Sequence, residues 1–171
     1  MELTRKTNKF IYLSIIPLIG ICLIIYMYQH ISSDIILSSN AQLEIKKEAL
    51  KHVEQQKAVK ITQKIARGND PKKVQSATVI MNVFPAELRA EALRVAMCES
   101  SMITHAKSTN RNGSHDWGLF QLNDGGTLQR LGGTIGLAKD AEWNAKAAYR
   151  LYLDRGWQPW VCAKKLNILK N

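Results

Sequence analysis

The sequence predicts a mainly helical α+β domain at residues 70–171 with one small β-hairpin lobe, preceded by a transmembrane helix and a helical stalk. Three observations lead to this prediction. Residues 10–28 form an uncharged apolar run, and residues 41–67 mix both charge signs without Gly or Pro. The rest of the chain carries helical patterns and one polar turn that precedes an aromatic-rich segment.

The apolar run, "FIYLSIIPLIGICLIIYMY" at residues 10–28, has the length of a membrane helix, since about 20 apolar residues cross the hydrocarbon core. Basic residues precede it, which predicts a cytoplasmic N-terminus at residues 1–9, a signal anchor, and an extracytoplasmic domain in the cell envelope. A cleavable signal peptide is the alternative, although its one plausible cut, after Ala41, is distant from the apolar run. Both interpretations export the C-terminal part.

Residues 29–69 are predicted to form a charged helical stalk or linker. The apolar residues between 41 and 67 are sparse, which favours a stalk over a strong coiled coil. "GND" followed by Pro71 marks a boundary near residue 69, where Asp70 can cap a new helix and Pro71 can begin it.

The cysteines agree with export. Cys22 lies in the apolar run, which leaves Cys98 and Cys162 outside. An oxidising compartment permits a disulfide between them, and two free buried thiols are the alternative.

The net charge of +10 favours an anionic partner. Export makes nucleic acid the least suitable candidate, so we expect the membrane surface or the anionic cell wall and no nucleic acid. A surplus of lysines that only keeps the domain soluble is the alternative.

The segment that begins at Pro85 carries a helical apolar stripe. Its spacing of four and three residues connects Leu88, Ala92, Val95 and Glu99. A carboxyl group on an apolar face is penalised when charged, so its pKa rises towards the range of a general acid at neutral pH. The alternative is a glutamate at a frayed helix end in solvent.

Asp116 follows the turn signal Asn112-Gly113 and leads into "WGLFQLN", which predicts a short hairpin. Asn112, Ser114 and Asn123 could donate hydrogen bonds to its carboxylate and keep it ionised. The last clear helix is predicted to begin after Asp140 and to stop before the glycine of "GWQPW". A hairpin beside the helices creates a cleft that both carboxyl groups would face.

Residues 97–123 resemble the active-site segment of c-type lysozyme and its bacterial and phage relatives in the lysozyme-like superfamily. "ESSMITHAKSTNRNGSHDWGLFQLN" matches the run from catalytic glutamate to catalytic aspartate, including the separation of 17 residues and the Gln-x-Asn ending. "NAKAAYRLYLDRGWQPW" resembles a later helix and tryptophan pair more weakly. The resemblance covers about residues 71–166.

The resemblance implies a lysozyme-like fold and a peptidoglycan hydrolase, a muramidase that cleaves the β-1,4 bond between N-acetylmuramic acid and N-acetylglucosamine. Glu99 would be the general acid and base, Asp116 the nucleophile or stabiliser, as in lysozyme itself. Trp157 would pack beside Glu99. Gln121 and Asn123 either bind sugar hydroxyls or satisfy the hairpin backbone.

Two other functions are compatible with the sequence. A cysteine directly before the glutamate is similar to transglycosylase-like relatives, and many lytic transglycosylases, which release 1,6-anhydromuropeptides, use a glutamate without an aspartate. A non-catalytic glycan-binding scaffold is the third possibility, although binding alone requires neither carboxyl group. His105 and His115 lack a consistent ligand set, so we expect no metal and no cofactor.

Overall fold

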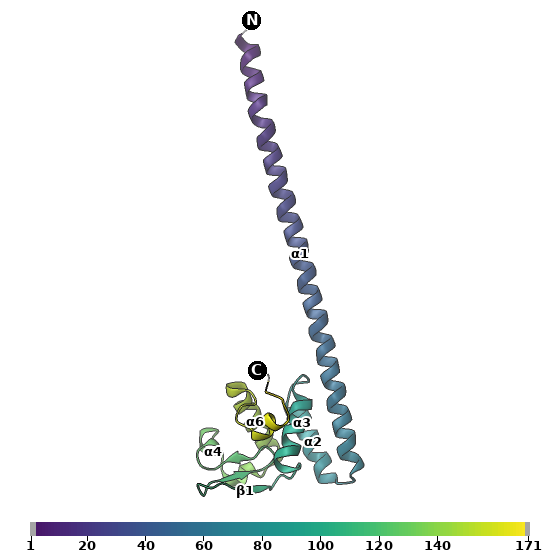
Figure 1. The fold of residues 1–171 in the computed structure, drawn as a ribbon, viewed down its shortest axis with the longest axis vertical. Coiled ribbons are helices and arrows are strands. Elements are labelled where there is room, and N and C mark those ends of the chain that lie inside the picture. Colours follow the sequence, from purple (N-terminus) through teal and green to yellow (C-terminus); the bar gives the residue numbers. More distant parts are fainter. Residues whose placement is uncertain (1–2, 170–171) are drawn as a thin grey trace. The chain divides into compact units, whose positions relative to one another are not determined.

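The computed structural model describes the backbone of residues 3–169 and the side chains of residues 22–31 and 37–169. One small antiparallel sheet among helices confirms the mainly helical α+β class (Figure 1). The elements in order are α1 (Leu3–Arg67), α2 (Pro71–Val83), α3 (Arg89–Ser100), β1 (Lys107–Thr109), β2 (His115–Trp117), β3 (Leu122–Asn123), α4 (Thr127–Arg130), α5 (Ile135–Ala138), α6 (Ala141–Arg155) and α7 (Val161–Lys165).

The chain divides into two compact units, Met1–Glu48 and Ala49–Asn171. The first unit contains the N-terminal part of α1. Within the described residues, no helix combines the length and the apolar character that crossing a membrane requires. The side chains of residues 10–21, most of the predicted span at 10–28, lie outside the described residues, as do those of the predicted cytoplasmic segment 1–9.

The second unit begins before the predicted domain boundary at residue 70, and the last turns of α1 belong to it. Ala58 and Ile65 are buried in its core, and the Thr62 hydroxyl lies 3.1 Å from the Met81 sulfur on α2. Ala58 and Ile65 are seven residues apart and therefore share one helix face. A sparse apolar stripe is thus sufficient to pack the end of the predicted stalk.

Side-chain caps begin α2 and α6 where the sequence predicted them. The Asp70 carboxylate accepts two main-chain N–H groups of the first turn of α2, whose first residue is Pro71. The Asp140 carboxylate accepts the Trp143 N–H at 2.7 Å, and Gly156, whose φ is 58°, caps the C-terminal end of α6. These caps satisfy N–H groups that have no partner inside the helix.

The helix expected from Pro85 begins later, at Arg89. Pro85 accepts the Leu88 N–H at 2.9 Å in a turn that precedes the helix. Phe84 is extended, as a residue before proline prefers, and is buried. The apolar stripe itself is confirmed further along α3, where Val95 is fully buried.

The predicted hairpin is part of a three-stranded antiparallel sheet in the order β1-β2-β3. Ser108 on β1 lies opposite Asp116 on β2, and Asp116 lies opposite Asn123 on β3. Asp116 therefore occupies the central strand. The β1–β2 turn closes with a 2.8 Å bond from the Asn110 N–H to the Ser114 carbonyl oxygen.

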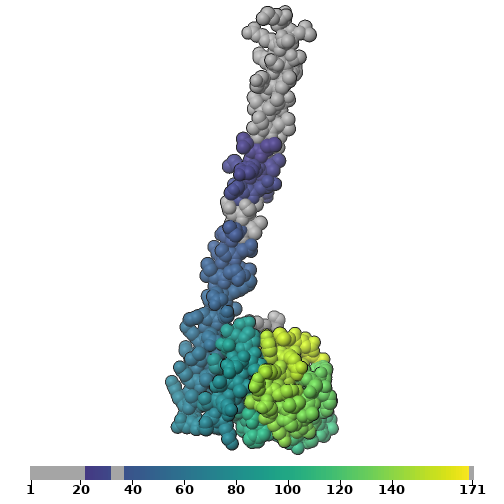
Figure 2. Space-filling view, turned by 180° about the vertical axis from the view of Figure 1, so that it is seen from behind, coloured from purple at the N-terminus to yellow at the C-terminus, as the bar shows by residue number. Residues whose placement is uncertain are grey.

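Aromatic side chains fill the core between the helices and the sheet. Phe84 stacks on Trp157 and Phe120, with ring centroids 5.9 and 5.5 Å apart. Trp160 meets Trp157 edge to face at 5.3 Å. The contacts of α2 with α6 and of α3 with α7 bring the yellow C-terminal segments against the teal ones in Figure 2.

A disulfide joins Cys98 at the end of α3 to Cys162 on α7 with an S–S distance of 2.03 Å. This confirms the predicted bridge. Cys22 is a free, exposed cysteine.

Asn144 on α6 is fully buried and ties the sheet to the helices. Its Oδ1 accepts the Phe120 N–H at 2.9 Å, and its Nδ2 donates to the carbonyl oxygens of Trp117 and Ala138 at 3.1 and 2.8 Å. Gly118, with φ of 78°, makes this approach possible, since a Cβ there would lie 2.1 Å from the Ala138 carbonyl oxygen.

We expect Asn144→Ala to lower the free energy of unfolding by about 2–5 kcal/mol, because it leaves buried main-chain groups without partners. Chemical denaturation of the variant and the parent measures the difference. Asn82→Ala, at an exposed position of α2, is the matched control and should change stability by no more than about 0.5 kcal/mol. Equal losses in the two variants would contradict the structural role of Asn144.

Candidate functional site

Glu99 and Asp116 line the same pocket of about 150 Å³ between the helices and the sheet. They come from different elements, the last turn of α3 and the central strand β2. The pocket is also lined by Gln121, Asn123, Thr127, Leu151, Trp160 and Val161. The structure thus brings together the two carboxyl groups predicted from the sequence.

Glu99 is partly buried at the end of the apolar stripe of α3. Burial raises the pKa of its carboxyl group, the 3.0 Å hydrogen bond from the Cys162 main-chain N–H opposes this, and the nearby charge of Asp116 adds to the rise. The net direction is upward, which favours the protonated form that a general acid needs.

Asp116 has a polar environment. Its Oδ1 accepts a 2.6 Å hydrogen bond from the Asn123 amide, and its Oδ2 accepts a 3.0 Å bond from the Asn110 amide. Donors on both oxygens stabilise a negative charge on the carboxylate. The two carboxyl groups therefore have different environments, one partly buried and the other hydrogen-bonded to two amides.

Further polar residues hold the two amides in place. The Asn123 Nδ2 also donates to the Ser114 hydroxyl at 3.0 Å, and its Oδ1 accepts the Gly125 N–H at 2.7 Å. The Asn112 side chain accepts the Ser114 N–H at 3.1 Å. Ser114 and Asn112 were expected to bond Asp116 directly, but the structure places them behind Asn110 and Asn123.

Gln121 lines the pocket but uses its amide within the protein. Its Nε2 donates to the carbonyl oxygen of Gly118 at 2.9 Å, and its Oε1 accepts the Ser108 hydroxyl at 2.7 Å. Its φ is 48°, a left-handed conformation that these bonds help to hold. This geometry favours the backbone role over sugar binding for Gln121.

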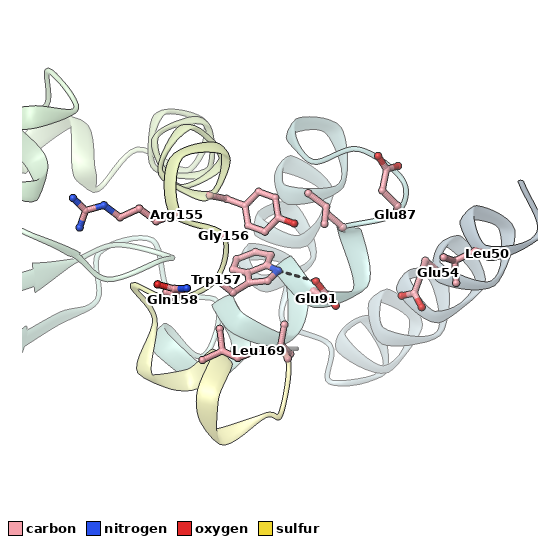
Figure 3. Close-up of a pocket in the computed structure, with 12 residues that line it drawn as sticks. Leu50, Glu54, Glu87, Glu91, Arg155, Gly156, Trp157, Gln158 and Leu169 are labelled. Atoms are coloured by element: carbon pink, nitrogen blue, oxygen red, sulfur yellow. Dashed lines mark hydrogen bonds between the residues drawn. The ribbon is translucent and has the colours of Figure 1, made fainter. Parts of the chain in front are cut away.

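The structure places Trp157 away from the Glu99 pocket, so the expected packing of Trp157 beside Glu99 is wrong. Figure 3 shows its indole in a separate pocket, where Nε1 donates to Glu91 Oε2 at 2.7 Å. Glu91 lies earlier on α3 than Glu99 and draws the indole towards that end of the helix. Trp160 lines the Glu99 pocket instead and donates from Nε1 to the Phe120 carbonyl oxygen at 2.9 Å.

Asp124 supports β2 from the side of the next loop. It accepts the His115 N–H at 2.7 Å and the Trp117 indole N–H at 3.0 Å, and these bonds lower the pKa of its carboxyl group. His115 Nδ1 also lies 3.2 Å from Asp124. His115 is therefore engaged with Asp124, and no group of three possible metal ligands occurs among the described residues.

Sequence reasoning missed Asn110, Trp160 and Asp124. Asn110 stands in the quoted "TNRN" motif, and pairing the strands across the Asn112-Gly113 turn would have brought it near Asp116. Asp124 lies within "NDGG", a motif that indicates a loop and no further role for the aspartate. Trp160 follows Trp157 by three residues in "GWQPW", and nothing in the sequence distinguishes which of the two tryptophans faces Glu99.

A partly buried acid and a hydrogen-bonded carboxylate in one pocket, on helices beside a small sheet, are the arrangement of a glycan-cleaving class of protein. Residues 77–162, about half of the chain, match the family model described as Lysozyme like domain, and the chain belongs to that family. No curated protein matches the chain significantly. Membership of the family suggests a glycan-cleaving enzyme that acts on peptidoglycan.

Glu99→Gln should stabilise the protein more at about pH 7 than at about pH 3.5. Because folding raises the Glu99 pKa, the stability linked to this group is present below the ordinary carboxyl pKa and is lost as the pH rises through the raised value. An uncharged amide avoids that loss. Thermal unfolding at both pH values measures the effect.

Glu142→Gln, at an exposed position on α6, is the matched control; it removes only an exposed ion pair with Lys146, so it should not stabilise the protein more at about pH 7 than at about pH 3.5. If Glu99→Gln changes the thermal stability equally at both pH values, burial does not raise the Glu99 pKa.

Proposed function

We propose that the chain is a peptidoglycan hydrolase, a muramidase that cleaves the β-1,4 bond between N-acetylmuramic acid and N-acetylglucosamine. The observation that carries the proposal is the pairing, in one pocket, of Glu99 with a raised pKa and Asp116 with amide donors on both oxygens. Membership of the lysozyme-like family supports the same substrate class.

In this proposal Glu99 protonates the leaving glycosidic oxygen, and its carboxylate then takes a proton from the attacking water. The raised pKa keeps a proton available for the first step. Asp116 stabilises the oxocarbenium-like centre by its negative charge. Since Asn110 and Asn123 occupy both of its oxygens, electrostatic stabilisation suits Asp116 better than nucleophilic attack.

The pairing of Glu99 and Asp116 in one pocket is also compatible with a second candidate function, that of a lytic transglycosylase. A stabilised cationic centre can be captured by water or by the 6-hydroxyl of the muramyl residue, which gives a 1,6-anhydro end. The presence of Asp116 favours hydrolysis, since many transglycosylases lack this carboxylate. A non-catalytic glycan-binding scaffold would need neither carboxyl group and is the third candidate.

We also propose that the N-terminal apolar run anchors the chain in a membrane and that the second compact unit acts outside the cytoplasm. The support is the uncharged run at residues 10–28 with basic residues before it. The disulfide between Cys98 and Cys162 suits an oxidising compartment. The net charge of +10 suits an anionic cell wall.

Incubation of the full-length chain with purified peptidoglycan should release muropeptides with reducing muramyl ends, identified by mass spectrometry. Glu99→Gln should lower the rate by about 10²–10⁴-fold, because it removes the transferable proton. Glu142→Gln should retain the parent rate. Products lighter by one water, with 1,6-anhydro ends, would identify the transglycosylase, and binding without products would identify the scaffold.

Asp116→Asn should lower the hydrolysis rate by at least about tenfold while substrate binding changes little, because it removes the charge that stabilises the cationic centre. The initial rate and the KM on peptidoglycan separate the two effects. Asp154→Asn, at an exposed position on α6, is the control and should behave as the parent. If the Asp116→Asn variant hydrolyses peptidoglycan at the rate of the parent, Asp116 has no catalytic role.

A further inference from the structure

Two links join Glu99 to a single residue of α7. The Glu99 Oε1 accepts the main-chain N–H of Cys162 at 3.0 Å, and Cys98, the residue directly before Glu99, forms the disulfide with the Cys162 side chain. One residue therefore holds both the backbone next to the glutamate and one oxygen of its carboxyl group.

The N–H of Cys162 belongs to the first turn of α7, where main-chain N–H groups have no acceptor inside the helix. Trp160, the N-cap residue, makes no capping hydrogen bond with its side chain. Glu99 supplies the acceptor from α3 instead. The same hydrogen bond thus satisfies the start of α7 and fixes the orientation of the glutamate.

The hydrogen bond also distinguishes the two carboxyl oxygens. The carbonyl oxygen of a carboxylic acid is a better acceptor than its hydroxyl oxygen, so the N–H bond to Oε1 favours the acid form that carries its proton on Oε2. General acid catalysis depends on where this proton points.

We propose that the Cys98–Cys162 disulfide and the Cys162 main-chain N–H together form a positioning clamp, which holds Glu99 so that Oε2 carries the proton to the leaving group. The effect of this clamp on catalysis rests on the proposed function. Cys162 is a positioning residue in this role, because it acts through Glu99 and donates no proton itself.

Other bonds hold α7 independently of the clamp. The Arg94 Nη2 donates to the Leu166 carbonyl oxygen at 3.0 Å, and Trp160 donates to Phe120 at 2.9 Å. Cys98 is exposed, so a reductant can reach the disulfide in the folded protein. Opening the bridge is therefore separable from unfolding.

The sequence contains three cysteines, so ¹⁵N-cysteine labelling of the full-length chain gives three amide signals, from Cys22, Cys98 and Cys162. In the oxidised protein the Cys162 signal should move with the titration of a carboxyl group whose pKa lies above its ordinary value, and Glu99→Gln should abolish this movement. An oxidised protein whose Cys162 amide does not follow Glu99 overturns the proposal without any further variant.

Reduction with a phosphine, and separately Cys98→Ala, should abolish the Cys162 titration and lower the cleavage rate by about 10–100-fold, with helical circular dichroism retained. Arg94→Gln removes another link between α3 and α7 and is the matched control. It should keep the Cys162 titration and a rate within about twofold of the parent.

The readouts separate two kinds of failure. Loss of the titration on reduction, in a protein that cleaves no glycan in either state, supports the clamp and overturns the proposed function. A reduced protein that keeps both the titration and the full cleavage rate overturns the clamp and leaves the proposed function standing.

Discussion

The buried amide of Asn144 is the interaction on which the second compact unit depends. It reaches from α6 to main-chain groups at Trp117, Phe120 and Ala138, and so connects the end of the central strand, the following loop and α5. Three hydrogen bonds in a dry core have defined directions, which apolar contacts lack. The position of β2, and with it Asp116, follows from this connection.

The chemical difference between the two carboxyl groups follows from the elements that carry them. Glu99 stands at the end of a helix whose inner face is apolar, so packing removes water from its carboxyl group. Asp116 stands on a strand whose neighbours supply amide donors. One pocket therefore gives its two carboxyl groups different environments, because one is carried by a helix with an apolar face and the other by a strand between polar neighbours.

Local signals predicted the fold well. The caps at Asp70 and Asp140 depend on residues next to the helix start, and the stripe on α3 depends on helical period alone. The orientation of Trp157 could not be predicted, since it is decided by Glu91, a partner distant in the sequence. The two carboxyl groups that the resemblance singles out lie in one pocket, whereas the place of Asn110 required the strand register.

The last turns of α1 have a consequence for what counts as the smallest autonomous folding unit. Ala58 and Ile65 contribute to the same hydrophobic core as Phe84. Proteolytic release at Gly68 would therefore remove part of the core from the second compact unit and uncover apolar surface on α2. The segment that resembles a disposable spacer is, over its last turns, an integral part of the second compact unit.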